Sequence, residues 1–219
     1  CACGCRTDAG GGIHPQDTAA LRAWFTDKNT VLLAGPGLGE SAGNICNVLL
    51  GKRQPWVAAV LDADALNALA AGTLRAALPE HTILTPHPGE AARLLDTTVQ
   101  EIQADREGAV RQLAEEYNCV AVLKGNGTLI TAPGEPVWRN TTGNAGLARG
   151  GSGDILAGIM AGLLASGWQQ GRSALQAAVS AVWLHGAAAD RCVKRRSSTA
   201  MLPQDIFADL GILLAEMDA

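Results

Sequence analysis

The sequence has no excess of basic residues and no apolar run long enough to cross a membrane. Its 219 residues carry 17 Lys and Arg against 21 Asp and Glu, so the formal net charge is -4. That balance leaves no general positive field for nucleic acid or an anionic membrane surface. The longest apolar run, 155–165, is far shorter than the roughly 20 residues that span a bilayer. We therefore expect no nucleic-acid or membrane role, and any phosphate site must be local.

The sequence also lacks the paired C-x-x-C spacing of zinc modules and the pattern of a signal peptide. Three of its six cysteines lie within the first five residues, and we have no physical account of them. Cys46, Cys119 and Cys192 stand in apolar surroundings, which is typical of buried free thiols. This distribution predicts a protein of the reducing cytoplasm.

Two common nucleotide-binding motifs are missing as well. No G-x-x-x-x-G-K-[ST] occurs, which excludes the P-loop class. The glycines of 35–39 (GPGLG) lack the G-x-G-x-x-G spacing, and no acidic residue ends a following strand at the expected distance. The pattern therefore argues against a Rossmann dehydrogenase.

What the sequence does contain is a regular alternation of apolar strands and helical patterns. The strands lack polar alternation, which favours an α/β domain with a mainly parallel central sheet and helices on both faces. A hydrophobic content of 47% supports a large core. The expected strands are 30–34, 56–61, 82–84, 119–123 and 128–131. The expected helices are 17–27, 40–50, 64–78, 88–95, 99–117, 154–165, 173–194 and 203–217.

Four polar or glycine-rich motifs directly follow the strands. They are 35–39 (GPGLG), 62–67 (DADALN), 85–90 (TPHPGE) and 124–128 (KGNGT). Ligands bind outside the carboxyl ends of the strands in open α/β sheets. We therefore expect one cleft to collect all four motifs.

The glycine-rich segment 143–153 runs into a helical pattern that begins at Asp154. Gly150, Gly151 and Gly153 lack Cβ atoms, so the loop can bring its amides close to a phosphate, and a helix start attracts anions. Asp154 is either an N-cap or a catalytic acid, and the three preceding glycines favour an anion-binding loop. Beside a phosphate, this carboxylate would face the second reactant and accept the proton of an attacking hydroxyl as general base.

Lys124–Thr128 (KGNGT) places a cation, two glycines and a hydroxyl between two apolar strands. An ordinary hairpin turn explains the Asn-Gly pair equally well. Lys124 at the strand end, facing the expected cleft, favours a nucleotide contact.

His87 lies between two prolines, which restrict the backbone on both sides. Pro88 fits the first position of the next helix and Glu90 its third, so part of this motif is a helix start. A rigidly held imidazole at the cleft also suits a polar substrate, and we favour that role for His87.

The segment 62–67 closes one strand and opens a helix, where Asp64 suits an N-cap. Asp62 or Asn67 can instead reach a metal, water or substrate, and we name Asn67 as a candidate substrate contact. His185 stands among apolar helical residues and is interpreted as a satisfied core histidine. No set of residues is predicted as metal ligands.

Taken in order, these motifs closely resemble the ADP- or ATP-dependent NAD(P)H-hydrate dehydratases, members of the ribokinase-like superfamily. The resemblance is carried by GPGLG, DADALN, TPHPGEAARLL, VLKGNGT and GNAGLARGGSGDILAG, over roughly residues 30 to 210. It is strongest to the carboxy-terminal half of bifunctional bacterial members, whose amino-terminal half is an NAD(P)H-hydrate epimerase. It therefore implies an epimerase partner, upstream or in trans, and we further expect a homo-oligomer.

The resemblance implies ADP-dependent dehydration of (S)-NAD(P)H hydrate to NAD(P)H, with release of AMP and phosphate. ATP is the alternative nucleotide, and Mg²⁺ would bridge the phosphates. By motif match, Gly37, His87 and Asp154 would contact the hydrate, with Asp154 as base. The residues that would hold the nucleotide are Lys124, Gly125, Asn126, Gly127, Thr128 and Gly153.

The sequence departs from the family pattern in two places. Ser152 stands where the family usually has Thr or another small residue, which is a mild change. Arg149 stands where a small residue is usual, and it would either contact phosphate or point to solvent. Nothing before Thr30 matches the strand that usually opens the domain, so we expect 1–29 to be an atypical or truncated segment and 30–219 to be the dehydratase domain. The alternatives are a ribokinase-like vitamin or sugar kinase and a catalytically dead nucleotide-binding module.

Overall fold

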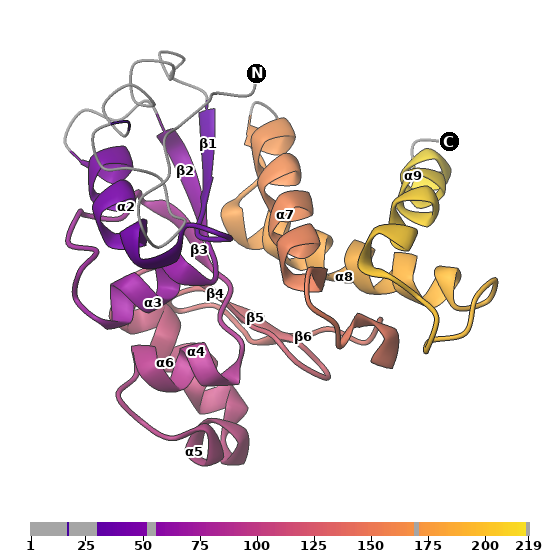
Figure 1. Ribbon diagram of the computed structural model, residues 1–219, viewed down its shortest axis with the longest axis horizontal. Coiled ribbons are helices and arrows are strands. Elements are labelled where there is room, and N and C mark those ends of the chain that lie inside the picture. The colour runs from indigo at the N-terminus through magenta and orange to yellow at the C-terminus, as the bar shows by residue number, and fades with distance from the viewer. Residues whose placement is uncertain (1–16, 18–29, 52–55, 169–170, 218–219) are drawn as a thin grey trace.

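A computed structural model describes residues 17, 30–51, 56–168 and 171–217, and a six-stranded sheet forms its centre (Figure 1). The strand order follows the chain, and the first four strands pair in parallel while the last two pair antiparallel. This confirms the mainly parallel sheet. The strands are β1 (Thr30–Ala34), β2 (Trp56–Leu61), β3 (His81–Leu84), β4 (Val120–Leu123), β5 (Leu129–Thr131) and β6 (Trp138–Arg139).

Helices cover both faces of the sheet, as the strand composition predicts (Figure 1). On one face lie α2 (Ala42–Leu50), α3 (Asp64–Ala70), α4 (Pro88–Leu94), α5 (Val99–Ala104) and α6 (Arg106–Tyr117). On the other lie α7 (Ser152–Trp168) and α8 (Ala174–Cys192), and α9 (Ile206–Met217) packs beside α8. Short 3₁₀ helices occur at Gly39–Ser41, Ala145–Leu147 and Pro203–Asp205.

The central strands explain why the sequence shows no polar alternation. Successive side chains of a strand point to opposite faces. In β2, Ala59 and Leu61 join the core under α2–α6, while Ala58 and Val60 join the core under α7 and α8. Because both faces are covered, every one of these positions has to be apolar.

Two predicted helices are shorter than expected. The helix expected over 64–78 ends at Ala70, because Gly72 adopts a positive φ of 66° and turns the chain away. The helix expected over 99–117 breaks at Asp105, whose side chain accepts a hydrogen bond from Gly108 N at 2.8 Å and starts α6 afresh. The two-residue strand β6 was not predicted at all.

Three further predictions concern the cysteines, membrane-spanning helices and the N-terminal segment. Cys46, Cys119 and Cys192 are buried free thiols, as expected, and burial raises the pKa of the Cys46 thiol to about 11. No helix in the described part of the chain is both long and apolar enough to span a bilayer. The expected helix over 17–27, apart from residue 17, and the atypical segment 1–29 lie outside the described residues.

Candidate active site

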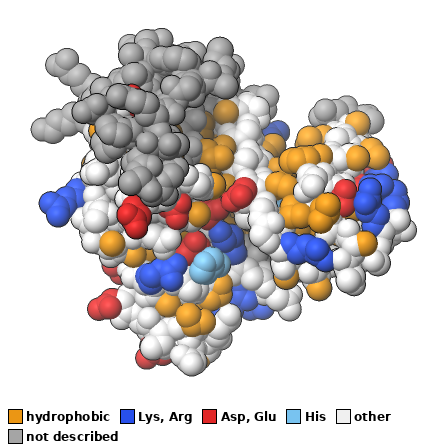
Figure 2. Space-filling view, viewed as in Figure 1, with side chains coloured by type: hydrophobic (Ala, Val, Ile, Leu, Met, Phe, Trp, Pro, Cys, Tyr) orange, Lys and Arg blue, Asp and Glu red, His pale blue; other side chains and the backbone are white. Residues whose placement is uncertain are grey.

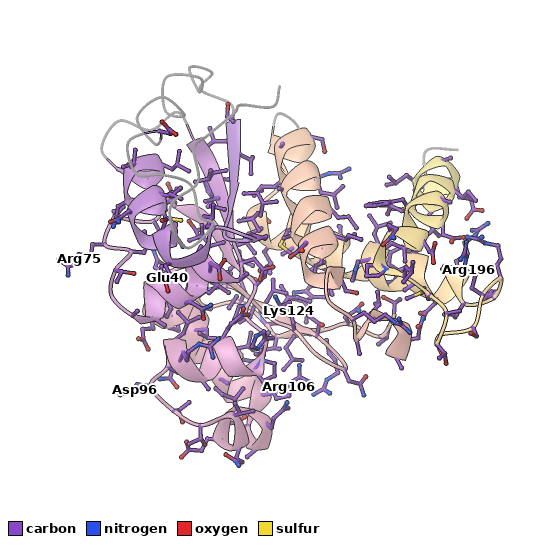
Figure 3. The ribbon with its side chains drawn as sticks, in the orientation of Figure 1. Glu40, Arg75, Asp96, Arg106, Lys124 and Arg196 are labelled. Carbon is purple, nitrogen blue, oxygen red and sulfur yellow. The ribbon has the colours of Figure 1, made fainter. Side chains whose placement is uncertain are left out.

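The ends of β2, β3 and β4 meet at one edge of the sheet, as the motif positions predict. Lys124, directly after β4, donates its backbone N–H to the carbonyl of Pro86, after β3, at 2.8 Å. The Lys124 ammonium lies 2.6 Å from Oδ1 of Asp62, which follows β2. Lys124 lies between this edge and the start of α7 (Figure 3). Three motifs that are distant in sequence therefore share one site.

Charged groups are concentrated around Lys124. Asp62 is 2% exposed and Glu90 is 5% exposed, and Glu90 Oε2 lies 3.8 Å from the Lys124 ammonium. Two buried carboxylates thus face a single ammonium group, so this corner keeps a net negative charge. Acidic, basic and histidine side chains gather in the middle of this face in the space-filling view (Figure 2). Carboxylates placed together in this way suit a divalent cation.

The start of α7 touches the same cluster. A Cβ atom on Gly153 would lie 3.5 Å from the Lys124 ammonium and 3.6 Å from Asp62 Oδ2. Gly153 therefore brings the helix N-terminus, with its unpaired amides, into contact with the charged pair. The predicted nucleotide residues Lys124 and Gly153 are brought together.

Asp154 is an exposed residue of the first turn of α7, and of its two alternative roles the structure excludes the N-cap. The helix begins two residues earlier, at Ser152. The Asp154 side chain forms no hydrogen bond with any described residue, so it satisfies none of the first amides. Its carboxylate is left available, one residue after Gly153.

The GPGLG loop packs directly on Asp62. A Cβ at Gly35, where φ is 133°, would fall 1.7 Å from the Asp62 carbonyl oxygen, so only glycine fits. A Cβ at Gly37 would instead meet no atom of the described residues within 4 Å, so Gly37 lies on the open side of the loop. Asp64 accepts a hydrogen bond from Gly39 N at 2.9 Å and does not cap α3, which corrects its predicted role.

His87 caps α4 through one ring nitrogen, and its other ring nitrogen lies near the Glu90 carboxylate. Its Nδ1 accepts hydrogen bonds from Gly89 N at 2.9 Å and Glu90 N at 3.2 Å, and Glu90 Oε2 accepts from His87 N at 2.8 Å. With Pro88 at the first helical position, this confirms the predicted helix start. Because Nδ1 accepts, the proton of the neutral ring is on Nε2, which lies 3.5 Å from Glu90 Oε1 on a side chain that is 51% exposed. His87 is therefore a fixed hydrogen-bond donor.

Asn67 lies one turn into α3, and its side chain has a structural partner. Arg93 Nε, on α4, donates to Asn67 Oδ1 at 3.0 Å. This contact ties α3 to α4 and leaves the Asn67 amide nitrogen for another partner. The neighbouring contact between Asp62 and Lys124 does not include Asn67.

The Lys124–Thr128 segment is a hairpin turn between β4 and β5, which confirms that interpretation, and Lys124 also lies at the site edge. Gly125 and Gly127 adopt positive φ values of 139° and 62°. Arg106 of α6 donates from Nη1 to Asn126 O at 2.6 Å and from Nη2 to Leu123 O at 3.2 Å. Sequence reasoning missed Arg106. The available signal was a cation at the first position of a helix, where the macrodipole disfavours it.

The loop before α7 is fastened to α8. Asp190 accepts hydrogen bonds from Gly143 N at 2.7 Å and from the Asn144 amide at 2.9 Å. Arg149 is exposed and donates from Nη2 to the Thr199 carbonyl. α8 therefore holds the loop that leads into Gly153.

His185 is buried, as predicted, and it is satisfied at only one of its ring nitrogens. Its Nε2 has no hydrogen-bond partner among the described residues, and the same holds for the buried Ser152 hydroxyl at the start of α7. Burial lowers the pKa of His185 to about 4, opposed by the Ser152 backbone. The imidazole is therefore neutral near pH 7. Neither residue belongs to a metal cluster, since no group of three or more His, Cys, Asp or Glu in the described ranges could hold an ion.

This geometry agrees with what the chain is similar to. A protein-family profile described as NAD(P)H-hydrate dehydratase matches residues 13–211. The chain belongs to this family. The match begins before Thr30, where the motif resemblance starts.

Two relatives carry related names. An ADP-dependent (S)-NAD(P)H-hydrate dehydratase of Neisseria meningitidis serogroup B is 46% identical over 179 residues, which cover 80% of this chain and 58% of the relative. A bifunctional NAD(P)H-hydrate repair enzyme of Moorella thermoacetica is 44% identical over 190 residues, which cover 86% of this chain and 35% of the relative. The chain thus spans about a third of the bifunctional protein.

Solved structures confirm the ribokinase-like fold. An ADP/ATP-dependent NAD(P)H-hydrate dehydratase from Bacillus subtilis, co-crystallised with ATP and Mg²⁺, gives a TM-score of 0.72 at 33% identity, covering 85% of this chain and 64% of that one. A ribokinase-like superfamily protein from Enterococcus faecalis gives a TM-score of 0.77 at 28% identity, covering 93% of this chain and 69% of that one.

Proposed function

We propose that this protein catalyses the ADP-dependent dehydration of (S)-NAD(P)H hydrate to NAD(P)H, with release of AMP and phosphate. The observation that carries the proposal is the contact of Gly153, at the start of α7, with the Lys124 and Asp62 pair, with Asp154 as the next residue. A phosphate-binding helix start and a free carboxylate are thereby adjacent. The names of the Neisseria and Bacillus relatives support the same reaction.

Asp154 acts as general base in this proposal. The ring hydroxyl of the hydrate attacks the terminal phosphorus of ADP, Asp154 accepts the hydroxyl proton, and AMP leaves. The new phosphate ester then eliminates phosphate together with a proton from the adjacent ring carbon, which restores the double bond of NAD(P)H. The exposed position of Asp154, without a hydrogen-bond partner among the described residues, supports its role.

The hydrate occupies the side of the site formed by Gly37, His87 and Asn67. No atom of the described residues lies within 4 Å of a Cβ built on Gly37, and His87 Nε2–H, on a half-exposed ring, is a fixed donor for a polar group. The amide nitrogen of Asn67 is available because Arg93 binds only its oxygen. These features give a polar substrate donors of fixed direction.

The nucleotide occupies the side formed by Gly153 and Lys124, Gly125, Asn126, Gly127 and Thr128. Lys124 supplies positive charge, while the glycines let backbone amides approach the phosphates. We propose ADP as the preferred nucleotide, on the strength of the Neisseria relative's name, with ATP as the alternative.

The residues present also fit Mg²⁺. Asp62 and Glu90 are buried carboxylates that share the single ammonium of Lys124, and Mg²⁺ commonly binds one or two carboxylates together with substrate phosphates. Asp62 and Glu90 would hold the ion with the nucleotide. When bound, Mg²⁺ neutralises charge that develops on the phosphates.

Absorbance of the reduced nicotinamide ring tests the proposal. The protein is incubated with NADH hydrate, NADPH hydrate or neither, each with ADP or ATP and Mg²⁺. Recovery of the absorbance with stoichiometric phosphate and AMP supports the dehydratase. A stable phosphorylated product without recovery indicates a kinase, and ADP binding in calorimetry without turnover indicates a catalytically dead module.

We also propose a homo-oligomer that works with an NAD(P)H-hydrate epimerase in the cytoplasm. Trp138, Trp183 and Met217 are 53%, 42% and 64% exposed and line a cavity of about 300 Å³. Exposed apolar surface of this kind supports self-association. The bifunctional names of several relatives support a second activity as partner, and sedimentation velocity measures the assembly.

A further inference from the structure

The turn at Lys124–Thr128 has its carbonyl groups gathered on one side by Arg106. The guanidinium donates to Asn126 O at 2.6 Å and to Leu123 O at 3.2 Å, and it lies 3.4 Å from Lys124 O. These contacts reach 17 to 20 residues along the chain, from the first position of α6 to the turn after β4. In Figure 3, Arg106 lies on the same face as Lys124.

Peptide geometry then fixes where the amides of the turn point. In a trans peptide the C=O of one residue and the N–H of the next point in opposite directions. Since the carbonyls of Lys124 and Asn126 face Arg106, the N–H groups of Gly125 and Gly127 face away from it. Neither amide donates to another residue in the described part of the chain.

The amide of Lys124 shows where that other side lies. The carbonyl of Leu123 faces Arg106, and the next N–H, that of Lys124, donates to Pro86 O at the site edge at 2.8 Å. The free amides of Gly125 and Gly127 follow directly in the chain. Successive backbone N–H groups on one side of a glycine turn form an anion-binding concavity.

We propose that Arg106 is a positioning residue for nucleotide binding, because it holds the carbonyls of the turn so that the Gly125 and Gly127 amides are presented to a phosphate. The inference rests on the proposed function. Arg106 does not touch the nucleotide; it acts through the backbone of the turn.

The surroundings of Arg106 support a role in the turn rather than in α6. A cation at the first position of a helix is electrostatically unfavourable. The guanidinium is partly buried, its Nε has no partner among the described residues, and burial together with the nearby Arg139 lowers the pKa of Arg106. A fork of several N–H groups is needed to reach three carbonyls, which the single ammonium of lysine does not provide.

The experiment compares Arg106→Gln and Arg106→Lys with the same changes at Arg111. Arg111 lies on the same helix and donates to Glu135 O at 3.3 Å, away from the turn. ADP affinity is measured by calorimetry, and kcat and KM are measured for ADP and for the hydrate. Circular dichroism and thermal melting show that each variant is folded.

We expect Arg106→Gln to raise the Kd and KM for ADP at least tenfold and Arg106→Lys to raise them less. The KM for the hydrate stays within twofold, both Arg111 variants resemble the wild type, and millimolar guanidinium partly restores ADP affinity to Arg106→Gln. A purely structural defect would change both KM values and would not respond to guanidinium.

Two outcomes separate the two proposals. If the wild-type chain binds no ADP, the proposed function fails. If the wild type binds ADP and the folded Arg106→Gln variant binds it equally tightly, the positioning role of Arg106 is overturned while the function stands. Should Arg106→Gln not fold, the same comparison is made with Arg106→Lys, where unchanged ADP affinity overturns the role.

Discussion

The Lys124 ammonium lies 2.6 Å from the carboxylate of Asp62, 62 residues earlier in the chain, and this pair joins the ends of β2 and β4. Both side chains are largely removed from water, at 18% and 2% exposure. A buried pair contributes little net stability relative to an apolar pair, but removal of one partner leaves an uncompensated charge. The pair therefore both holds the edge together and places a cation at the proposed phosphate site.

The first prediction concerns this pair. Asp62→Asn leaves the Lys124 ammonium with only Glu90 nearby, and we expect the free energy of unfolding to fall by roughly 2 to 4 kcal/mol. Lys124→Met should lower the free energy of unfolding by a similar amount, because the carboxylates of Asp62 and Glu90 then repel each other without a cation between them. Urea denaturation of the wild type, both single variants and the double variant gives a double-mutant cycle, which measures the interaction between the two groups. Strictly additive losses would show that the two groups do not interact in solution.

The second prediction concerns Asp154. Asp154→Asn keeps the size of the side chain but removes its ability to accept a proton, so kcat should fall by roughly 10²–10⁴-fold. ADP affinity in calorimetry should stay the same, because the phosphate contacts are backbone amides and Lys124. Asp96→Asn, at a residue far from the cluster around Lys124, serves as the control. A mutant that keeps most of its turnover would show that Asp154 is not the base.

The third prediction uses two helical glycines. A Cβ at Gly186 on α8 would lie 2.2 Å from Thr142 Oγ1 and 2.7 Å from the Thr142 backbone, whereas one at Gly158 on α7 meets nothing within 4 Å. Gly186→Ala should therefore destabilise the protein by roughly 1 to 3 kcal/mol. Gly158→Ala should stabilise it by about 0.5 to 1 kcal/mol, because alanine favours the helix. Thermal melting compares the two, and equal shifts would contradict the close packing of the 140s loop on α8.

The fourth prediction is a pH dependence caused by His185. Burial lowers its pKa to about 4 from an ordinary value of 6.5, so the unfolded chain binds the proton more readily in that interval. Stability is therefore present above pH 6.5 and is lost as the pH falls towards 4. Between pH 7 and pH 5 the contribution amounts to roughly 2 kcal/mol.

Denaturation of the wild type and His185→Leu at both pH values measures this contribution. The fall in the free energy of unfolding between pH 7 and pH 5 should be smaller in His185→Leu by that amount. The control is His81→Gln, at a less buried histidine of β3, which should show the same pH dependence as the wild type. An identical pH dependence in His185→Leu and wild type would show that His185 titrates normally in the folded protein.

Features that depend on neighbouring residues were predicted well. The capping of α4 by His87, Pro88 and Glu90 needs only four consecutive residues, and the structure contains it. The break at Asp105 had the same kind of local signal, an aspartate that suits an N-cap, but the surrounding helical pattern obscured it. Asp154 was correctly predicted to lie at the start of a helix, although the helix begins two residues earlier than predicted, at Ser152.

The sequence by itself determined the α/β class and the common edge of the motifs, because apolar strands without polar alternation require a covered parallel sheet and such a sheet aligns its strand ends. Only the tertiary structure decided which side chains meet there. Lys124 with Asp62, Arg106 with the turn at Asn126, and Asp190 with Gly143 are contacts between residues at least 20 positions apart. No local pattern encodes them, because they arise from the packing of separate helices and strands around the two cores.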